Sequence, residues 1–145
     1  MAEAQATHPS SIEVPSALRF WFVVHFVADI IFAIPLMFMP EAFLGWCGWK
    51  CVDPISARLV AAALFGIGIE SLISRNADIY AFRSMLGMKV IWSFTAFAGI
   101  GLSLLEGAHG RPLMGWGFFA TFVGFHGLWL YWRITVGKII AKHQG

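Results

Sequence analysis

Four apolar segments, each about long enough to cross a membrane, constrain this chain more than any other feature of its sequence. They lie at about residues 17–39, 55–73, 85–106 and 113–134, and the last has an amphipathic continuation to Lys142. A transmembrane helix needs roughly 20 mainly apolar residues. The composition agrees, because 59% of the residues are hydrophobic and only 12% are charged, which is far from the balance of a soluble domain. We therefore predict an all-α polytopic membrane protein.

The connectors between these segments are short and rich in proline, glycine and charged residues, as turns between helices are. Short connectors make consecutive helices antiparallel neighbours. The sequence thus predicts an up-down bundle of four transmembrane helices over residues 17–140, with a flexible N-terminal tail at 1–16 and a C-terminal tail at 141–145. Residues 1–16 contain no Lys or Arg, so they do not have the pattern of a cleaved signal peptide.

Basic residues are concentrated on one side of the predicted bundle. The side with both termini has seven (Arg19, Arg75, Arg83, Lys89, Arg133, Lys138 and Lys142), and the other has three (Lys50, Arg58 and Arg111). The positive-inside rule then places both termini in the cytoplasm, in a cell inner membrane. Tryptophans mark both predicted interfaces, with Trp21, Trp129 and Trp132 at the inner one and Trp46, Trp49 and Trp116 at the outer one. The net charge of +2, with no basic stripe, argues against a nucleic-acid partner.

Five ionisable side chains fall within the predicted spans, and in this topology they share one half of the bilayer. Such residues are costly in lipid and usually face the interior of a bundle, where they pair with one another or serve a function. We therefore predict an intramembrane polar cluster. Its members are His25, Asp29, Glu70, Lys89 and His126.

Several kinds of chemistry can use such a cluster, and the sequence leaves them open. His25 and His126 come from facing helices at similar depth, as bis-histidine haem ligation requires. Together with Asp29 and Glu70 they also supply enough ligands for a divalent metal, or a chain of groups for proton transfer. The simplest alternative is an ion pair between Glu70 and Lys89, with Asp29 accepting a hydrogen bond from His25 or Ser93. No motif with a diagnostic spacing decides among them.

Small residues recur along three of the predicted helices. Ala62, Gly66 and Glu70 are four residues apart; two further stripes comprise Ser93, Ala96, Gly99 and Ser103, and Gly117, Thr121 and Gly124. Small residues in membrane helices allow close approach of a second helix. We therefore expect these stripes to be packing faces.

The segment GWCGWKC, residues 45–51, contains both cysteines of the chain, Cys47 and Cys51. Their Cys-x-x-x-Cys spacing in a connector differs from the Cys-x-x-Cys at a helix start that activates a thioredoxin-type thiol. A turn with this spacing allows the alpha carbons to come close enough for a disulfide. A structural disulfide and two free thiols both remain open, and catalytic redox chemistry is a third alternative.

The order of several motifs resembles a known family. AIPLMFMPEAFLGW, followed by VDP, RLVAAALFGIGI and MLGMKVIW, is similar to the small four-helix bacterial membrane proteins of the DoxX-like superfamily, over about residues 17–135. The resemblance implies a four-helix inner-membrane protein. Some members of the family are linked to thiol and sulfur oxidation through the quinone pool. No catalytic motif of the family maps onto these residues, so the resemblance implies architecture more than activity.

Short connectors and the absence of any reaction-specific motif favour a non-catalytic role. We expect a subunit or accessory protein of a larger membrane complex, or a homo-oligomer, in contact with the lipid bilayer. One alternative is a membrane redox protein of DoxX-like type that uses a quinone or haem. A second alternative is a small proton-coupled transporter or channel protomer built around Asp29, Glu70 and His126.

Overall fold

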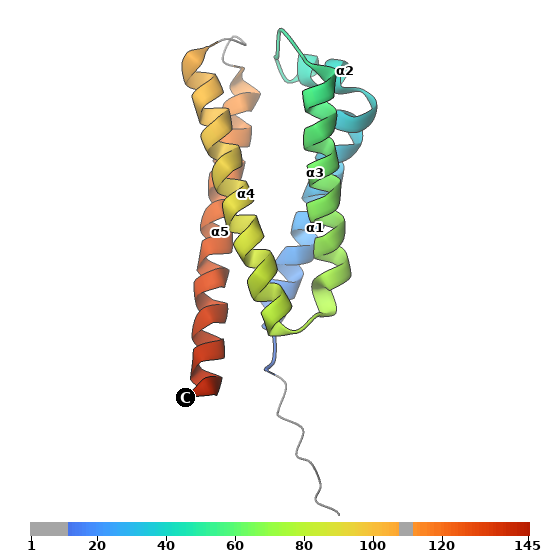
Figure 1. The fold of residues 1–145 in the computed structure, drawn as a ribbon. Coiled ribbons are helices and arrows are strands. Elements are labelled where there is room, and N and C mark those ends of the chain that lie inside the picture. The colour runs from blue at the N-terminus through green and yellow to red at the C-terminus, as the bar shows by residue number, and fades with distance from the viewer. Residues whose placement is uncertain (1–11, 108–111) are drawn as a thin grey trace, which may run out of the picture.

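The computed structural model describes residues 12–107 and 112–145, so most of the predicted N-terminal tail, as well as Arg111, lies outside the described residues. The described chain is all-α (Figure 1). Four long helices are apolar enough to cross a membrane, as the sequence predicted. They are α1 (Ser16–Phe38), α3 (Pro54–Ile73), α4 (Ile79–Glu106) and α5 (Leu113–Gln144); the short α2 (Pro40–Trp46) follows α1, and the 3₁₀ turn η1 (Ser74–Asn76) follows α3.

The long helices form two hairpins rather than one evenly packed bundle. Helix α1 packs along α3, and α4 packs along α5. The two hairpins meet near η1 and diverge toward the opposite end (Figure 1). The larger hydrophobic core joins α1, α4 and α5 near the meeting point, and it comprises Val14, Leu18, Phe22, Ile79, Phe82, Leu86, Trp129, Trp132, Val136 and Ile140. A smaller core has its buried members on α1 and α3, and these are Ala33, Leu36, Ala57, Ala61 and Leu64.

An aspartate side chain caps the N-terminus of both α3 and α4. The carboxylate of Asp53 accepts hydrogen bonds from the backbone N–H groups of Ile55 and Ser56, and that of Asp78 accepts from Tyr80 and Ala81. These bonds satisfy N–H groups that lack partners within the helix. Hydrogen bonds from the Ser56 hydroxyl, and then from the two backbone groups, hold the pKa of Asp53 below its usual range.

Two helices are longer than the sequence predicted. Helix α4 begins at Ile79 rather than near residue 85, because Asp78 caps it there and because Ile79 and Phe82 are buried in the larger core. Helix α5 continues to Gln144, so the predicted C-terminal tail at 141–145 is almost entirely helical. Val136 and Ile140 extend the core along this last part of α5.

The connector after α2 joins the hairpins at their far ends. The ring of Trp49 lies 5.9 Å from that of Phe118 on α5, and Phe32 on α1 lies 5.5 Å from the same ring. Gly48 has a φ of 95°, and a Cβ at this position would lie 3.1 Å from Cβ of Pro112. Both the positive φ and the close contact favour glycine here. The hairpins are therefore connected at both ends of the molecule.

Candidate functional site

Lys89 contacts all three of the other long helices. This α4 residue is only 1% exposed. Its Nζ donates a hydrogen bond of 2.7 Å to Oγ of Ser71 on α3 and lies 3.0 Å from Nδ1 of His25 on α1. The same nitrogen lies 4.9 Å from the ring centroids of Phe22 on α1 and Trp129 on α5. Aromatic faces attract a cation, most strongly when it is desolvated. A single ammonium group thus links both hairpins.

His25 and Asp29 lie one helical turn apart on α1 and are both buried. Nδ1 of His25 is 2.9 Å from Oδ2 of Asp29. Yet Oδ2 has no correctly oriented hydrogen-bond donor among the described residues, so this contact is a close approach of the two side chains and not a formed hydrogen bond. Asp29 also supplies the charge opposite to Lys89. Opposite charges offset part of the cost of burying each of them.

Nδ1 of His25 has two neighbours that require different protonation states. A ring nitrogen carries either a lone pair or a hydrogen, whereas an ammonium group can only donate. The contact with Lys89 requires the lone pair, and a hydrogen bond to the carboxylate of Asp29 requires the hydrogen. The two neighbours therefore compete for one atom. His25, Asp29 and Lys89 thus meet at one ring nitrogen, and together with Ser71 they form a group of four side chains that we call the lysine cluster.

The backbone of α3 packs directly on Asp29 through Gly68. A Cβ on Gly68 would lie 2.8 Å from Cβ and 3.2 Å from Oδ2 of Asp29. Real Cβ atoms do not approach other atoms so closely, so glycine is required for this helix contact. The close approach keeps the carboxylate in its buried position.

His126 lies beside the lysine cluster but has its own partners. Oγ of Ser93 donates to the backbone carbonyl of Lys89 at 2.7 Å and lies 3.1 Å from Nδ1 of His126. The same Nδ1 is 3.2 Å from the carbonyl oxygen of Val90. A carbonyl only accepts, so this contact requires a hydrogen on Nδ1 and leaves the lone pair of the neutral ring on Nε2.

The two intramembrane histidines border different aromatic rings. His25 lies against Phe125 and Trp129, each at a centroid distance of 5.0 Å. His126 lies against Phe94 and Phe97. Residues 12–107 and 112–145 contain no group of three or more His, Cys, Asp or Glu side chains placed to hold a metal ion. The structure therefore brings His25 together with Lys89 and Asp29, and it gives His126 separate contacts.

Glu70 lies apart from the lysine cluster. Its side chain is on the exposed face of α3 and accepts a hydrogen bond of 2.5 Å from Oγ of Ser74. The predicted Glu70–Lys89 ion pair is therefore wrong, because Lys89 contacts Ser71 and His25 instead. Consecutive residues of a helix point about 100° apart. Ser71 faces inward, so its neighbour Glu70 faces outward.

Sequence reasoning missed three residues around Lys89, namely Ser71, Phe22 and Trp129. Trp129 was predicted only as a residue of the inner membrane interface; in the structure it is 1% exposed and packs over the ammonium group. A signal was present in the sequence, because the ammonium group of a lysine within an apolar helix needs hydrogen-bond acceptors or aromatic faces around it. Which residues provide these groups depends on how the neighbouring helices are rotated about their own axes.

The two cysteines are free thiols, Cys47 buried and Cys51 exposed. Cys47 ends the short helix α2, and Cys51 lies in the connector that follows. Burial raises the pKa of the Cys47 thiol. A raised pKa disfavours the thiolate, which is the reactive form. In place of a disulfide, the structure therefore has two free thiols that differ in their access to solvent.

We expect a thiol-alkylating reagent at neutral pH to label Cys51 first and Cys47 much more slowly. Mass spectrometry of peptides sampled over time measures both rates, and a Cys51→Ser variant isolates that of Cys47. The rate for Cys47 should rise further with increasing pH, because its thiolate forms only at higher pH. Equal rates, or labelling of both residues only after reduction, would contradict this arrangement.

Comparisons of the chain with protein-family models, with curated proteins and with solved structures find no match.

Proposed function

We propose that this chain is a non-catalytic subunit or accessory protein of a larger membrane assembly. The observation that carries the proposal is a set of open glycine faces on the outside of the helices. A Cβ on Gly66 of α3, or on Gly117 or Gly124 of α5, would meet no atom within 4 Å. Two of the three small-residue stripes predicted as packing faces thus lie on the exposed surface of the molecule, one on α3 and one on α5.

Glycine has a cost in a helix, about 1 kcal/mol relative to alanine. In membrane helices this cost is offset where a second helix packs closely against the glycine. Within this chain, Gly66, Gly117 and Gly124 have no such neighbour. A helix of another subunit is the partner that would make use of them.

The exposed face of α3 supports the same proposal. Ala62 and Gly66 continue into Glu70, whose carboxylate is exposed close to the end of the helix. A carboxylate that faces lipid is costly and is usually paired. A partner helix with a basic or hydrogen-bonding side chain at this level would cover Glu70 together with the glycine face.

The proposal also covers the orientation of the chain in the membrane and its relationship to a known family. The excess of Lys and Arg on the side with the termini supports cytoplasmic termini in an inner membrane. The resemblance of the helix motifs to DoxX-like proteins supports a small four-helix membrane component. The buried lysine cluster fits this role, because it stabilises the fold without an exposed reactive group.

The mass of the protein extracted in native-lipid particles tests the proposal. We expect an assembly larger than one 16.1 kDa chain, with a second protein or further copies. Gly66→Leu and Gly124→Leu should release the single chain, because the larger side chain prevents close helix contact. Val60→Phe is the matched control, since Val60 is exposed on another side of α3. A wild-type protein that is a single chain in these particles would refute the proposal.

A further inference from the structure

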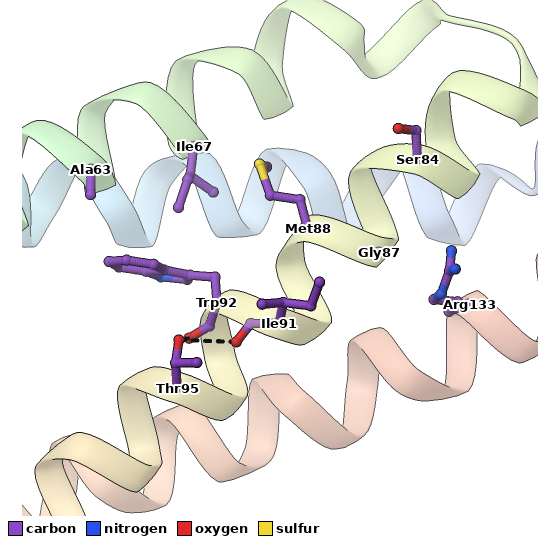
Figure 2. Close-up of a pocket in the computed structure, with 9 residues that line it drawn as sticks. All are labelled: Ala63, Ile67, Ser84, Gly87, Met88, Ile91, Trp92, Thr95 and Arg133. Carbon is purple, nitrogen blue, oxygen red and sulfur yellow. Dashed lines mark hydrogen bonds between the residues drawn. The ribbon is translucent and has the colours of Figure 1, made fainter.

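A groove of about 700 Å³ runs along one face of α4 (Figure 2). The α4 residues that line it are spaced three or four apart from Ser84 to Thr95, and this spacing places them on one side of the helix. Ala63 and Ile67 of α3 form one wall, opposite Trp92 (Figure 2). Except at its end near Ser84, the wall is almost entirely apolar.

A single cationic side chain lies at that polar end. Arg133 of α5 reaches across α4 at Gly87, where a Cβ would lie 3.3 Å from Nη1 of Arg133. Nη1 donates a hydrogen bond of 2.8 Å to the carbonyl oxygen of Arg83. A guanidinium group has five N–H donors, and this is the one hydrogen bond that the described residues give Arg133. The remaining donors are available at this end of the groove, where Ser84 also belongs to the lining.

The position of Arg133 along its helix matches a headgroup boundary. No Asp, Glu, Lys or Arg occurs from Leu113 to Trp132. At a rise of 1.5 Å per residue, Arg133 lies about 30 Å from Leu113, which is the thickness of the hydrocarbon core of a bilayer. The groove runs from Ser84 to Thr95, about 16 Å by the same rise. That length is about half the thickness of the hydrocarbon core, which is the depth of one leaflet and so about the length of one acyl chain.

We propose that this groove binds one anionic phospholipid. Its phosphate lies against the guanidinium of Arg133 and the hydroxyl of Ser84, and one acyl chain lies along Met88 and Trp92. The charge at one end and the apolar wall beyond it match the two parts of such a lipid. A neutral amphiphile of the same length would leave the guanidinium without a counter-charge. The site does not depend on the assembly proposed above.

Quenching of Trp92 fluorescence by brominated lipid tests this site. The protein is reconstituted in phosphatidylcholine vesicles that contain phosphatidylglycerol, with bromine on the acyl chains of one lipid at a time. The difference between the protein and a Trp92→Phe variant isolates the signal of Trp92. We expect brominated phosphatidylglycerol to quench Trp92 more strongly than brominated phosphatidylcholine does. Arg133→Gln should reduce that selectivity about five-fold, the factor for one basic group at a membrane surface.

Lys138→Gln is the matched control, because Lys138 is an exposed basic residue of the same helix outside the groove. Selectivity that is lost in Arg133→Gln and kept in Lys138→Gln supports the site. Equal losses in the two variants would show only general attraction to an anionic surface and would overturn the proposal. Equal quenching by both lipids in the wild-type protein would also overturn it, and would favour a neutral occupant.

Discussion

Lys89→Met should destabilise the protein by about 3 to 5 kcal/mol, the range for leaving a buried charge without compensation. Methionine is similar in length to lysine, so the change removes charge with little loss of volume. Asp29 is then left as a buried carboxylate without its counter-charge, and Ser71 and His25 lose their contact with the ammonium group. The free energy of unfolding in mixed detergent micelles measures the effect.

Asp29→Asn combined with Lys89→Met provides the control. The double variant has no unpaired charge, and replacement of a buried ion pair by neutral groups is often close to neutral in stability. We expect it to recover most of the stability that Lys89→Met loses. If the stability losses of Asp29→Asn and Lys89→Met measured singly add up in the double variant, then Asp29 and Lys89 act independently, and this would contradict the proposed cluster.

Gly68→Ala should destabilise the protein by about 1 to 3 kcal/mol, the usual cost of inserting a methyl group into a filled site. The new Cβ would lie 2.8 Å from Cβ of Asp29. Either α3 moves away from α1, or Asp29 leaves its position beside His25. The same unfolding measurement detects the loss.

Gly66→Ala is the matched control two residues earlier on α3. A Cβ on Gly66 meets no atom of its own chain within 4 Å, so in the single chain in mixed micelles alanine should be neutral or stabilise the helix by up to about 1 kcal/mol. The two substitutions are chemically identical, and therefore the difference between them reports only the contact with Asp29. A Gly68→Ala variant as stable as Gly66→Ala would mean that α3 and α1 are not in contact at this point.

The four long helices are predictable from the sequence because hydropathy and length alone determine them. Their ends are harder to predict. Residues 74–84 contain three charged side chains and resemble a connector, yet Asp78 caps a helix within them and Ile79 is buried at its first position. Capping depends on a single side chain and burial on packing, and neither affects a hydropathy average.

The lysine cluster is only partly predictable, for a geometric reason. His25 and Asp29 are four residues apart on one helix, and this spacing alone brings them together. Whether Lys89 meets Glu70 or its neighbour Ser71 depends on a rotation of α3 by about 100°. Helix α3 is apolar on nearly all sides, so its sequence does not specify that rotation. The close contact of Gly68 with Asp29 specifies it in the structure.

Lys89 joins the two hairpins through His25, and solid-state NMR of the protein in lipid bilayers can measure this contact. With ¹⁵N-labelled lysine and histidine and ¹³C-labelled glutamate, dipolar couplings report the distances from Nζ of Lys89. We predict a weak but measurable ¹⁵N–¹⁵N coupling to Nδ1 of His25, at about the 3.0 Å of the structure, and no coupling to the carboxyl carbon of Glu70. A short distance to Glu70, with none to His25, would contradict this connection between the hairpins.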